Sequence, residues 1–285
     1  MIKIIECPRD AMQGIPFFIP TEKKIDYINQ LLKVGFDTLD FGSFVSPKAI
    51  PQLKDTQEVL DKLDLSNTNT KLLAIIANIK GAENAVKNST IDYLGYPFSI
   101  SETFQQRNTN SSIVDSFEKV KAIQELCNKH NKQLVIYISM GFGNPYGDSW
   151  NKDIAGEWVE KLYKQGIKIF SLSDTVGQAN TEDISYIFKE LIPHFSNCEF
   201  GAHLHTTKEN WSQNITAAYN SGCRRFDAAL KGFGGCPMAE DDLVGNLATE
   251  NLIHFLQKEE EKLNLDLEAF NQAMNMAPNI FESIS

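Results

Sequence analysis

The feature that most constrains this chain is an eightfold alternation of short apolar runs with longer segments whose apolar residues have helical spacing. The short runs are nearly continuous and rich in β-branched residues, which is typical of parallel strands buried on both faces. In the segment 21–36, Ile25, Ile28 and Leu31 would form one face of an amphipathic helix. We expect strands at 2–7, 38–44, 71–78, 90–100, 133–140, 168–174, 198–205 and 224–230.

Eight strand–helix units in 285 residues fit a closed (β/α)8 barrel, the TIM barrel, because this α/β fold typically takes about 250 residues. An open doubly wound sheet is the alternative, but no GxGxxG motif follows the first strand. We expect a single catalytic domain over 1–285, with the barrel at about 1–257. Two helices, at 267–274 and 279–285, would form a short C-terminal helical extension within about 258–285.

Composition and charge exclude several classes of protein. The net charge of −10 argues against a nucleic-acid-binding protein, since such proteins neutralise phosphates with basic surfaces. No run of about 18 apolar residues is present, so we expect no membrane span. The start, MIKIIECPRD, reads as a strand rather than a signal peptide. The five cysteines form no CxxC pair, which indicates reduced thiols and a cytoplasmic protein.

Polar residues gather where the predicted strands end, which is where barrels of this kind carry their chemistry. His203 and His205 are two residues apart in a strand, so their side chains point to the same face. With Asp10 and Asn246 they offer two imidazoles, a carboxylate and an amide oxygen. This set suits a divalent metal ion, and Mg²⁺ or Mn²⁺ fits it better than structural zinc. A pair of ordinary histidines is the alternative interpretation of the HxH motif alone.

Three further charged residues and a cysteine are candidates for the same centre. Arg9 would place a fixed positive charge where an enolate or oxyanion develops. Asp40 and Asp174 would be general bases, or else partners that orient the metal ligands and the arginine. Cys236 stands among glycines in KGFGGCPMAEDDLVGN, a composition that indicates a mobile loop over a reactive site.

Eight segments, in order along the chain, resemble the 3-hydroxy-3-methylglutaryl-CoA (HMG-CoA) lyases, which belong to the metal-dependent acyl-CoA lyase and Claisen-synthase barrels. SFVSPK and GGCP are specific to the lyases, whereas RD and HxH are common to the wider superfamily. The resemblance covers nearly the whole chain up to its last helices. The segments are RDAMQ (9–13), LDFGSFVSPKAIPQLKDTQEVL (39–60), ANIKG (77–81), SETFQQRNTNSS (101–112), SLSDTVG (171–177), AHLH (202–205), GFGGCPMA (232–239) and GNLATE (245–250).

This resemblance implies a retro-Claisen cleavage of HMG-CoA, an acyl-CoA substrate, to acetyl-CoA and acetoacetate. A bound metal, either Mg²⁺ or Mn²⁺ or else zinc, would lower the pKa of the substrate hydroxyl. Asp174 would assist removal of the hydroxyl proton, Arg9 would stabilise the acetyl-CoA enolate, and Cys236 would protonate it. The family also implies a homodimer. The implied metal ligands are Asp10, His203, His205 and Asn246, and the implied substrate-binding residues are Ser43, Asn78, Gly234 and Gly235.

Several residues depart from the lyase pattern and leave the substrate open. Asp40 stands where the lyases have glutamate, and Glu240 is acidic where they are neutral. A lyase for a different 3-hydroxyacyl-CoA is therefore an alternative, as are a Claisen-type synthase, a 2-oxo acid aldolase and a barrel that binds metal and acyl-CoA without turnover. The pathway, such as leucine degradation or ketone-body formation, is not fixed either. The other departures are Ala11, Met12, Asn144, Thr206 and Met238.

Overall fold

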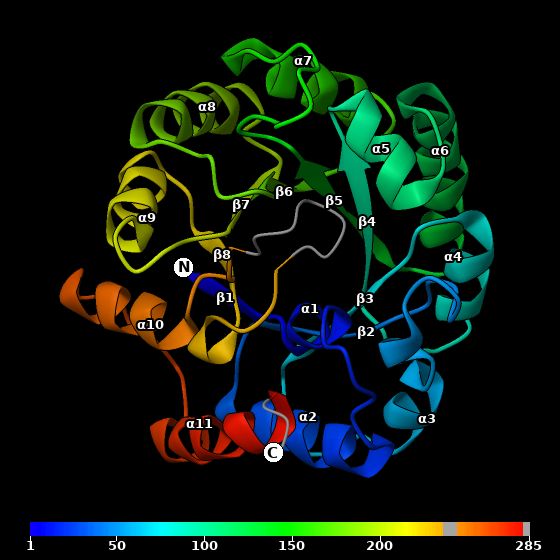
Figure 1. Ribbon diagram of the computed structural model, residues 1–285, viewed down its shortest axis with the longest axis vertical. Coiled ribbons are helices and arrows are strands. Elements are labelled where there is room, and N and C mark those ends of the chain that lie inside the picture. Colours follow the sequence, from blue (N-terminus) through cyan, green and yellow to red (C-terminus); the bar gives the residue numbers. More distant parts are fainter. Residues whose placement is uncertain (236–243, 282–285) are drawn as a thin grey trace.

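The computed structural model describes residues 1–235 and 244–281, and the eight strands in these ranges close into one barrel (Figure 1). Each strand pairs in parallel with its neighbour in chain order, and β1 pairs with β8 to complete the ring. The predicted (β/α)8 barrel is confirmed. The strands are β1 (Lys3–Glu6), β2 (Thr38–Ser43), β3 (Lys71–Ile75), β4 (Tyr93–Ser99), β5 (Gln133–Ser139), β6 (Ile169–Asp174), β7 (Glu199–Leu204) and β8 (Arg225–Ala228).

A ring of helices surrounds the barrel and buries apolar faces against its strands (Figure 1). Several of these helices begin at an Asn or Ser whose side chain accepts a hydrogen bond from a first-turn N–H, as at Ser112, Asn151 and Asn180. None of the described helices is long and apolar enough to cross a membrane. The ring contains α2 (Thr21–Val34), α3 (Thr56–Asp61), α4 (Ile79–Ala85), α6 (Ile113–Lys129), α7 (Lys152–Tyr163), α8 (Thr181–His194), α9 (Trp211–Asn220) and α10 (Thr249–Lys258).

Two short helices that the sequence did not predict interrupt the simple alternation: α1 (Pro8–Gln13) and α5 (Glu102–Thr109). Arg9 and Asp10 therefore lie on α1, a helix that follows β1, and not at the end of the first strand. Pro8 opens α1, where its fixed φ suits a helix start and its missing N–H costs no hydrogen bond. Two 3₁₀ turns, at Pro51–Leu53 and Leu230–Gly232, complete the regular structure of the described chain.

The C-terminal extension is a single helix, α11 (Leu267–Phe281), rather than the two helices expected. Pro278 lies inside it, and α11 continues through this residue because its apolar face is buried against α2. The ring of Phe281 stacks on Phe233 at a centroid distance of 4.8 Å and meets the edge of Tyr27 at 5.5 Å. The helix thereby connects α2 with the segment that follows β8.

The inside of the barrel is part apolar and part polar. Leu73, Ile75, Val135, Tyr137 and Ile169 form a small apolar cluster contributed by β3, β5 and β6. On the side of β7 and β8, by contrast, Arg225 and Asp227 are fully buried charged residues. Gly201 leaves room for this arginine, since a Cβ at that position would lie 2.9 Å from the Arg225 Cδ. The polar side is also the side that carries the two histidines.

Glu6, at the end of β1, ties the first strand to the last segment of the barrel. Its carboxyl is buried, and it accepts hydrogen bonds from the Leu230 N–H at 2.9 Å and from the Thr249 hydroxyl. Burial raises the pKa of Glu6 to about 8, although both hydrogen bonds oppose this rise. The carboxyl is therefore mostly neutral in the folded protein at pH 7, whereas it is ionised in the unfolded chain.

Replacing Glu6 with Gln should remove a pH-dependent part of the stability. A raised carboxyl pKa favours folding in full below pH 4.5, and this contribution is lost as the pH rises through about 8. From pH 6 to pH 9 we expect the free energy of unfolding to fall by about 3 kcal/mol more in the wild type than in Glu6→Gln, at about 1.4 kcal/mol per pKa unit. Urea denaturation at both pH values measures this difference. An equal fall in the free energy of unfolding between the two pH values in both proteins would contradict this prediction.

Candidate active site

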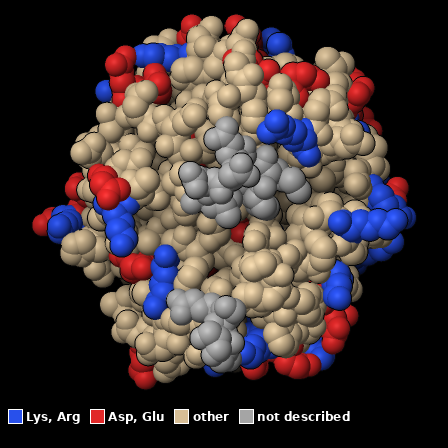
Figure 2. Space-filling view, in the orientation of Figure 1, with Lys and Arg blue, Asp and Glu red and all other residues tan. Residues whose placement is uncertain are grey.

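A cavity opens at the end of the barrel where the strands have their carboxyl ends. Its polar floor includes Arg9, Asp10, His203 and His205, and its wall is apolar, with Val45, Ile50, Ile75, Pro97 and Phe104 among its members. Figure 2 shows this face of the molecule, where the charged side chains of the described residues lie mainly around the periphery. The arrangement suits a ligand with an anionic group at the floor and an apolar part along the wall.

Three of the four expected metal ligands converge on this floor. Asp10 of α1 and the two histidines of β7 and its end each offer one donor atom, and these atoms lie within 4.8 Å of one another. The ring centroids of His203 and His205 are 5.4 Å apart. The alternation predicted for the HxH motif is therefore seen in the structure, since both imidazoles face the same cavity.

Asn246 joins this group through its amide. Its Nδ2 donates to Asp10 Oδ2 at 2.7 Å and to the Phe233 carbonyl at 2.9 Å. Because both amide hydrogens are used, the amide oxygen is the atom that is left for a metal ion. His205 and Asn246 are also paired by an antiparallel backbone bridge. The residues present therefore fit a divalent cation: one carboxylate, two imidazoles and an amide oxygen.

The surroundings keep Asp10 and His205 in the protonation states that can bind a metal ion. Burial would raise the pKa of Asp10, but Arg9 and the two histidines lower it below its ordinary value, so the carboxylate is ionised. Burial and the neighbouring His203 lower the pKa of His205 to about 4, so this ring is neutral at pH 7. Burial would also lower the pKa of His203, but Asp227 raises it above its ordinary value.

Arg9 is held in place from three sides. Its Nη1 donates to Asp10 Oδ1 at 2.8 Å and to Gln13 Oε1 at 2.9 Å, and its Nε and Nη2 both donate to Asp40. Among the described residues these contacts use four of the five N–H groups of the guanidinium. One N–H of Nη2 is thus available to an anionic ligand in the cavity.

Asp40 lies behind Arg9 rather than at the cavity. Its side chain is 1% exposed and forms the bidentate ion pair with the guanidinium. Within the part of the chain that the structure describes, the residues lining the cavity do not include Asp40. Of the two roles expected for this residue, the geometry fits the one that orients the arginine.

Asp174 ends β6 and organises the loop that follows it. Its two carboxylate oxygens accept hydrogen bonds from the backbone N–H groups of Gln178 at 2.9 Å and Ala179 at 3.0 Å. Burial raises the pKa of Asp174 to about 6, against the effect of these bonds. Its chain neighbours Ser173 and Thr175 line the cavity, whereas Asp174 itself is absent from the described lining.

Ser43 and Asn78 lie beside the main cavity and not in it. They line a second cavity of about 310 Å³ that shares Val45 with the first. The Ser43 hydroxyl accepts the Val45 N–H at 3.2 Å, and the Asn78 side chain caps α4 by accepting the Gly81 N–H at 2.8 Å. Both side chains therefore have structural partners, and the structure does not bring them to the histidines.

Gly234 passes very close to the metal ligands. A Cβ at this position would lie 2.6 Å from Asn246 Nδ2 and 2.9 Å from the Ala11 Cα, and the φ of +104° is one that other residues rarely adopt. Gly235 also has a positive φ, of +139°. Cys236, Met238 and Glu240 lie outside the described residues.

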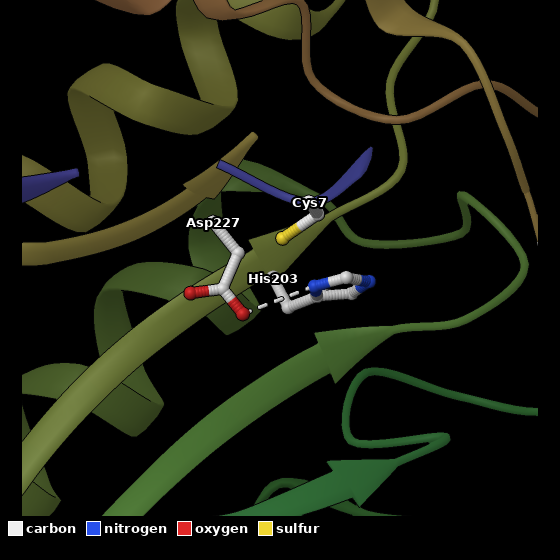
Figure 3. A group of neighbouring side chains, drawn as sticks. All are labelled: Cys7, His203 and Asp227. Atoms are coloured by element: carbon white, nitrogen blue, oxygen red, sulfur yellow. Dashed lines mark hydrogen bonds and ion pairs between the residues drawn. The ribbon is translucent and has the colours of Figure 1, made fainter. Parts of the chain in front are cut away.

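Sequence reasoning missed several groups around the site. Gln13 donates to Asp10 Oδ1 at 2.8 Å; its position four residues after Arg9 on a one-turn helix was the available signal. Tyr137 and Thr175 line the cavity. Asp227 of β8 pairs with His203 (Figure 3), and the signal for it was the presence of two charged residues, Arg225 and Asp227, in a strand that is buried along its whole length.

Among the departures from the lyase pattern, Asn144 has a structural role for its side chain, and Thr206 makes a contact through its backbone. Asn144 Oδ1 accepts the N–H groups of Tyr146 and Asp148, both at 3.1 Å, and its Nδ2 donates to the Asp148 carbonyl. It therefore closes the loop after β5. The backbone N–H of Thr206 donates to the Gly245 carbonyl at 2.9 Å, which brings Asn246 beside His205. Ala11 and Met12 are buried on α1.

Comparison with known proteins gives consistent matches over nearly the full chain. A family described as HMGL-like matches residues 2–277. The chain is 34% identical to the hydroxymethylglutaryl-CoA lyase YngG of Bacillus subtilis, over 92% of this chain and 86% of that protein. It is 30% identical to the 3-hydroxy-3-isohexenylglutaryl-CoA/hydroxymethylglutaryl-CoA lyase of Pseudomonas aeruginosa, over 95% of this chain and 90% of that protein.

Among solved structures, one similar protein is an HMG-CoA lyase from Acinetobacter baumannii in complex with coenzyme A and 3-methylmalate. The two chains superpose with a TM-score of 0.91 at 33% sequence identity, covering 99% of this chain and 91% of the other.

Replacing Gly234 with Ala should weaken metal binding at this site. The new Cβ would displace the Asn246 amide, and we expect the Mn²⁺ dissociation constant to rise about tenfold or more. Titration followed by electron paramagnetic resonance measures it. Gly147→Ala is the matched control, since Gly147 also has a positive φ but a Cβ there meets nothing within 4 Å. Equal affinities for the two variants would contradict the assigned role of Gly234.

Proposed function

The chain belongs to the HMGL-like family and is a carbon–carbon lyase, and from this we propose that it cleaves 3-hydroxy-3-methylglutaryl-CoA to acetyl-CoA and acetoacetate. The observation that carries the proposal is the convergence of Asp10, His203, His205 and Arg9 on the floor of one cavity. These four groups supply a cation site and a fixed positive charge side by side, as the reaction requires.

We propose Mg²⁺ or Mn²⁺ as the cation, held by Asp10, His203, His205 and Asn246. Carboxylate and amide oxygens favour these hard ions, and no cysteine thiolate is needed to complete the donor set. When bound, such an ion lowers the pKa of a coordinated hydroxyl and polarises a coordinated carbonyl oxygen.

Arg9 is proposed to stabilise the enolate that forms when the C2–C3 bond breaks. Its guanidinium is fixed by Asp40 and Gln13, so it needs no rearrangement as negative charge develops. Burial would lower the pKa of Arg9, but Asp40 and Asp10 raise it, so the charge is permanent. The one N–H that is not used by the described residues would be offered to the thioester oxygen.

Two groups are proposed to move protons. Asp174 would assist removal of the proton of the substrate hydroxyl from behind the cavity lining, where its chain neighbours Ser173 and Thr175 lie, and a pKa of about 6 suits a group that exchanges protons near neutral pH. Cys236 would protonate the enolate carbon and so release acetyl-CoA; its assignment rests on the resemblance of GGCP to the lyase loop. Gly234 and Gly235 remain proposed substrate contacts at the metal ligands, and Ser43 and Asn78 remain proposed contacts in the neighbouring cavity that shares Val45 with the main one. We also propose that the protein is cytoplasmic and forms a homodimer.

The cleavage assay with Mn²⁺ should show acetyl-CoA formation that EDTA abolishes. We expect Cys236→Ala to lower kcat by about 10²-fold or more, the usual effect of losing a proton-transfer group. Cys198→Ala is the matched control, because that thiol is partly exposed beside Glu199, at the opposite end of β7 from the histidines, and its kcat should stay within about twofold. A metal-independent reaction, or equal rates for both cysteine variants, would reject the proposed chemistry.

A substrate with a larger apolar branch at C3 is a second candidate. The apolar wall formed by Val45, Ile50, Ile75 and Phe104 favours it, and a relative from Pseudomonas aeruginosa is named for a 3-isohexenyl substrate as well as for the methyl one.

Comparing kcat/KM for the methyl and isohexenyl thioesters decides between the two substrates. If the wall receives the branch, Ile75→Ala should change the ratio of the two kcat/KM values by about tenfold or more. The reason is that each methylene buried against the wall contributes about 0.8 kcal/mol of transfer free energy, and the variant removes several of these contacts. An unchanged ratio would show that the branch does not contact this wall. Ile79→Ala, at an exposed position on α4, is the control.

A further inference from the structure

Asp227 lies on β8 directly opposite His203 of β7 in the register of the two strands. Figure 3 shows the carboxylate and the imidazole facing each other, with Cys7 beside them. The distance between His203 Nδ1 and Asp227 Oδ2 is 3.1 Å, which is within hydrogen-bonding range. The side chain of Asp227 has no exposed surface, and that of His203 is 11% exposed. The contact is therefore shielded from water, and the strand register fixes it.

This contact determines which ring nitrogen faces the cavity. A carboxylate can only accept a hydrogen bond, so Nδ1 of His203 must carry the hydrogen. In the neutral ring Nε2 then keeps its lone pair, which is the form that binds a metal ion. Tyr137 holds the ring from the side, edge-on at a centroid distance of 5.7 Å and an angle of 87°.

Asp227 is itself held in position. The hydroxyl of Ser171 donates to the same Oδ2 at 3.2 Å. The other oxygen, Oδ1, is buried and has no hydrogen-bond partner among residues 1–235 and 244–281. The thiol of Cys7 donates to the Ile5 carbonyl at 3.6 Å and so is not a donor to this carboxylate. A buried carboxylate with one unsatisfied oxygen is costly for the fold, which argues for a role beyond packing.

The second histidine has a different kind of hydrogen-bond partner. His205 is hydrogen-bonded to the backbone of Thr175, a neutral partner, whereas His203 faces a full negative charge. The carboxylate makes His203 the more basic of the two rings and increases the negative charge behind the cation site. The two histidines are therefore not equivalent as ligands.

We propose that Asp227 is a positioning residue that holds His203 as the Nδ1–H tautomer, aims its Nε2 at a cation shared with Asp10 and His205, and strengthens cation binding. The inference rests on the metal site of the proposed function. Asp227 lines neither the cavity floor nor its described wall, so it acts through His203 and not on the substrate.

The test compares Asp227→Asn and Asp227→Ala with the wild type by two readouts. Nitrogen-15 NMR of the imidazoles in metal-free protein reports the His203 tautomer, with His203→Gln used to assign the signals. Paramagnetic titration with Mn²⁺ reports the dissociation constant. Ser171→Ala is the matched control, because it removes the other hydrogen bond to Oδ2 and leaves the carboxylate in place.

We expect the wild type and Asp227→Asn to show Nδ1–H, because an amide oxygen can still accept this hydrogen bond. The Mn²⁺ dissociation constant should rise by about 10- to 100-fold in Asp227→Ala, less in Asp227→Asn, and little in Ser171→Ala. Wild-type affinity in both Asp227 variants would overturn the proposal, as would an Nε2–H tautomer in the wild type. If Asp227→Ala does not fold, the affinity of Asp227→Asn decides.

The two readouts also distinguish an error in the proposed cation site from an error in the role of Asp227. A wild type that binds no Mn²⁺ but shows the Nδ1–H tautomer would reject the proposed cation and leave the positioning of His203 by Asp227 supported. A wild type that binds Mn²⁺ with an Nε2–H tautomer would reject the role of Asp227 alone.

Discussion

The ion pair between Arg9 and Asp40 is the interaction on which the site depends. It joins the short helix α1 to β2 in a place that excludes water, and the same guanidinium donates to the candidate metal ligand Asp10. Removing one partner of a buried ion pair leaves an unpaired charge and costs about 3–5 kcal/mol. The pair also fixes the distance between the positive charge and the cation site, because one side chain takes part in both contacts. Asp40 has a shorter side chain than the glutamate expected at this position from the lyase pattern. It still reaches the guanidinium, because Nε and Nη2 of Arg9 both donate to its carboxylate.

The polar half of the barrel interior reflects a compromise between function and stability. Buried polar atoms of Arg225, Tyr137 and Asp227 have no hydrogen-bond partner within the described ranges. Such atoms destabilise a fold, and apolar side chains would pack there at lower cost. The opposite half of the interior, around Leu73 and Val135, has this apolar packing. Arg225 and Asp227 lie on β8 beside the histidines, whereas Tyr137 belongs to the apolar cluster and meets the ring of His203 edge-on.

The fold could be predicted from the sequence because its signal is periodic and local. Eight apolar runs with helical segments between them leave few alternatives to a closed barrel, and period-two alternation places His203 and His205 on one face.

The positions of Arg9 and Asp10 could not be predicted in the same way, because a short helix of six residues leaves no repeating pattern. Asp227 was missed for another reason: its partner is set by the register between two strands, and register is a property of the assembled sheet. Asn78 precedes a helix, where Asn is a favoured N-cap, but the pattern alone could not separate this role from a position facing the cavity.

The stack of Phe281 on Phe233 connects the surface of the molecule to its centre. Phe233 supplies the carbonyl that receives the amide of Asn246, and Phe281 belongs to the outermost helix, α11. Two contacts therefore separate a peripheral helix from a candidate metal ligand. In evolutionary terms, α11 is a region where substitutions can tune the geometry of the centre while every residue of the cavity stays the same.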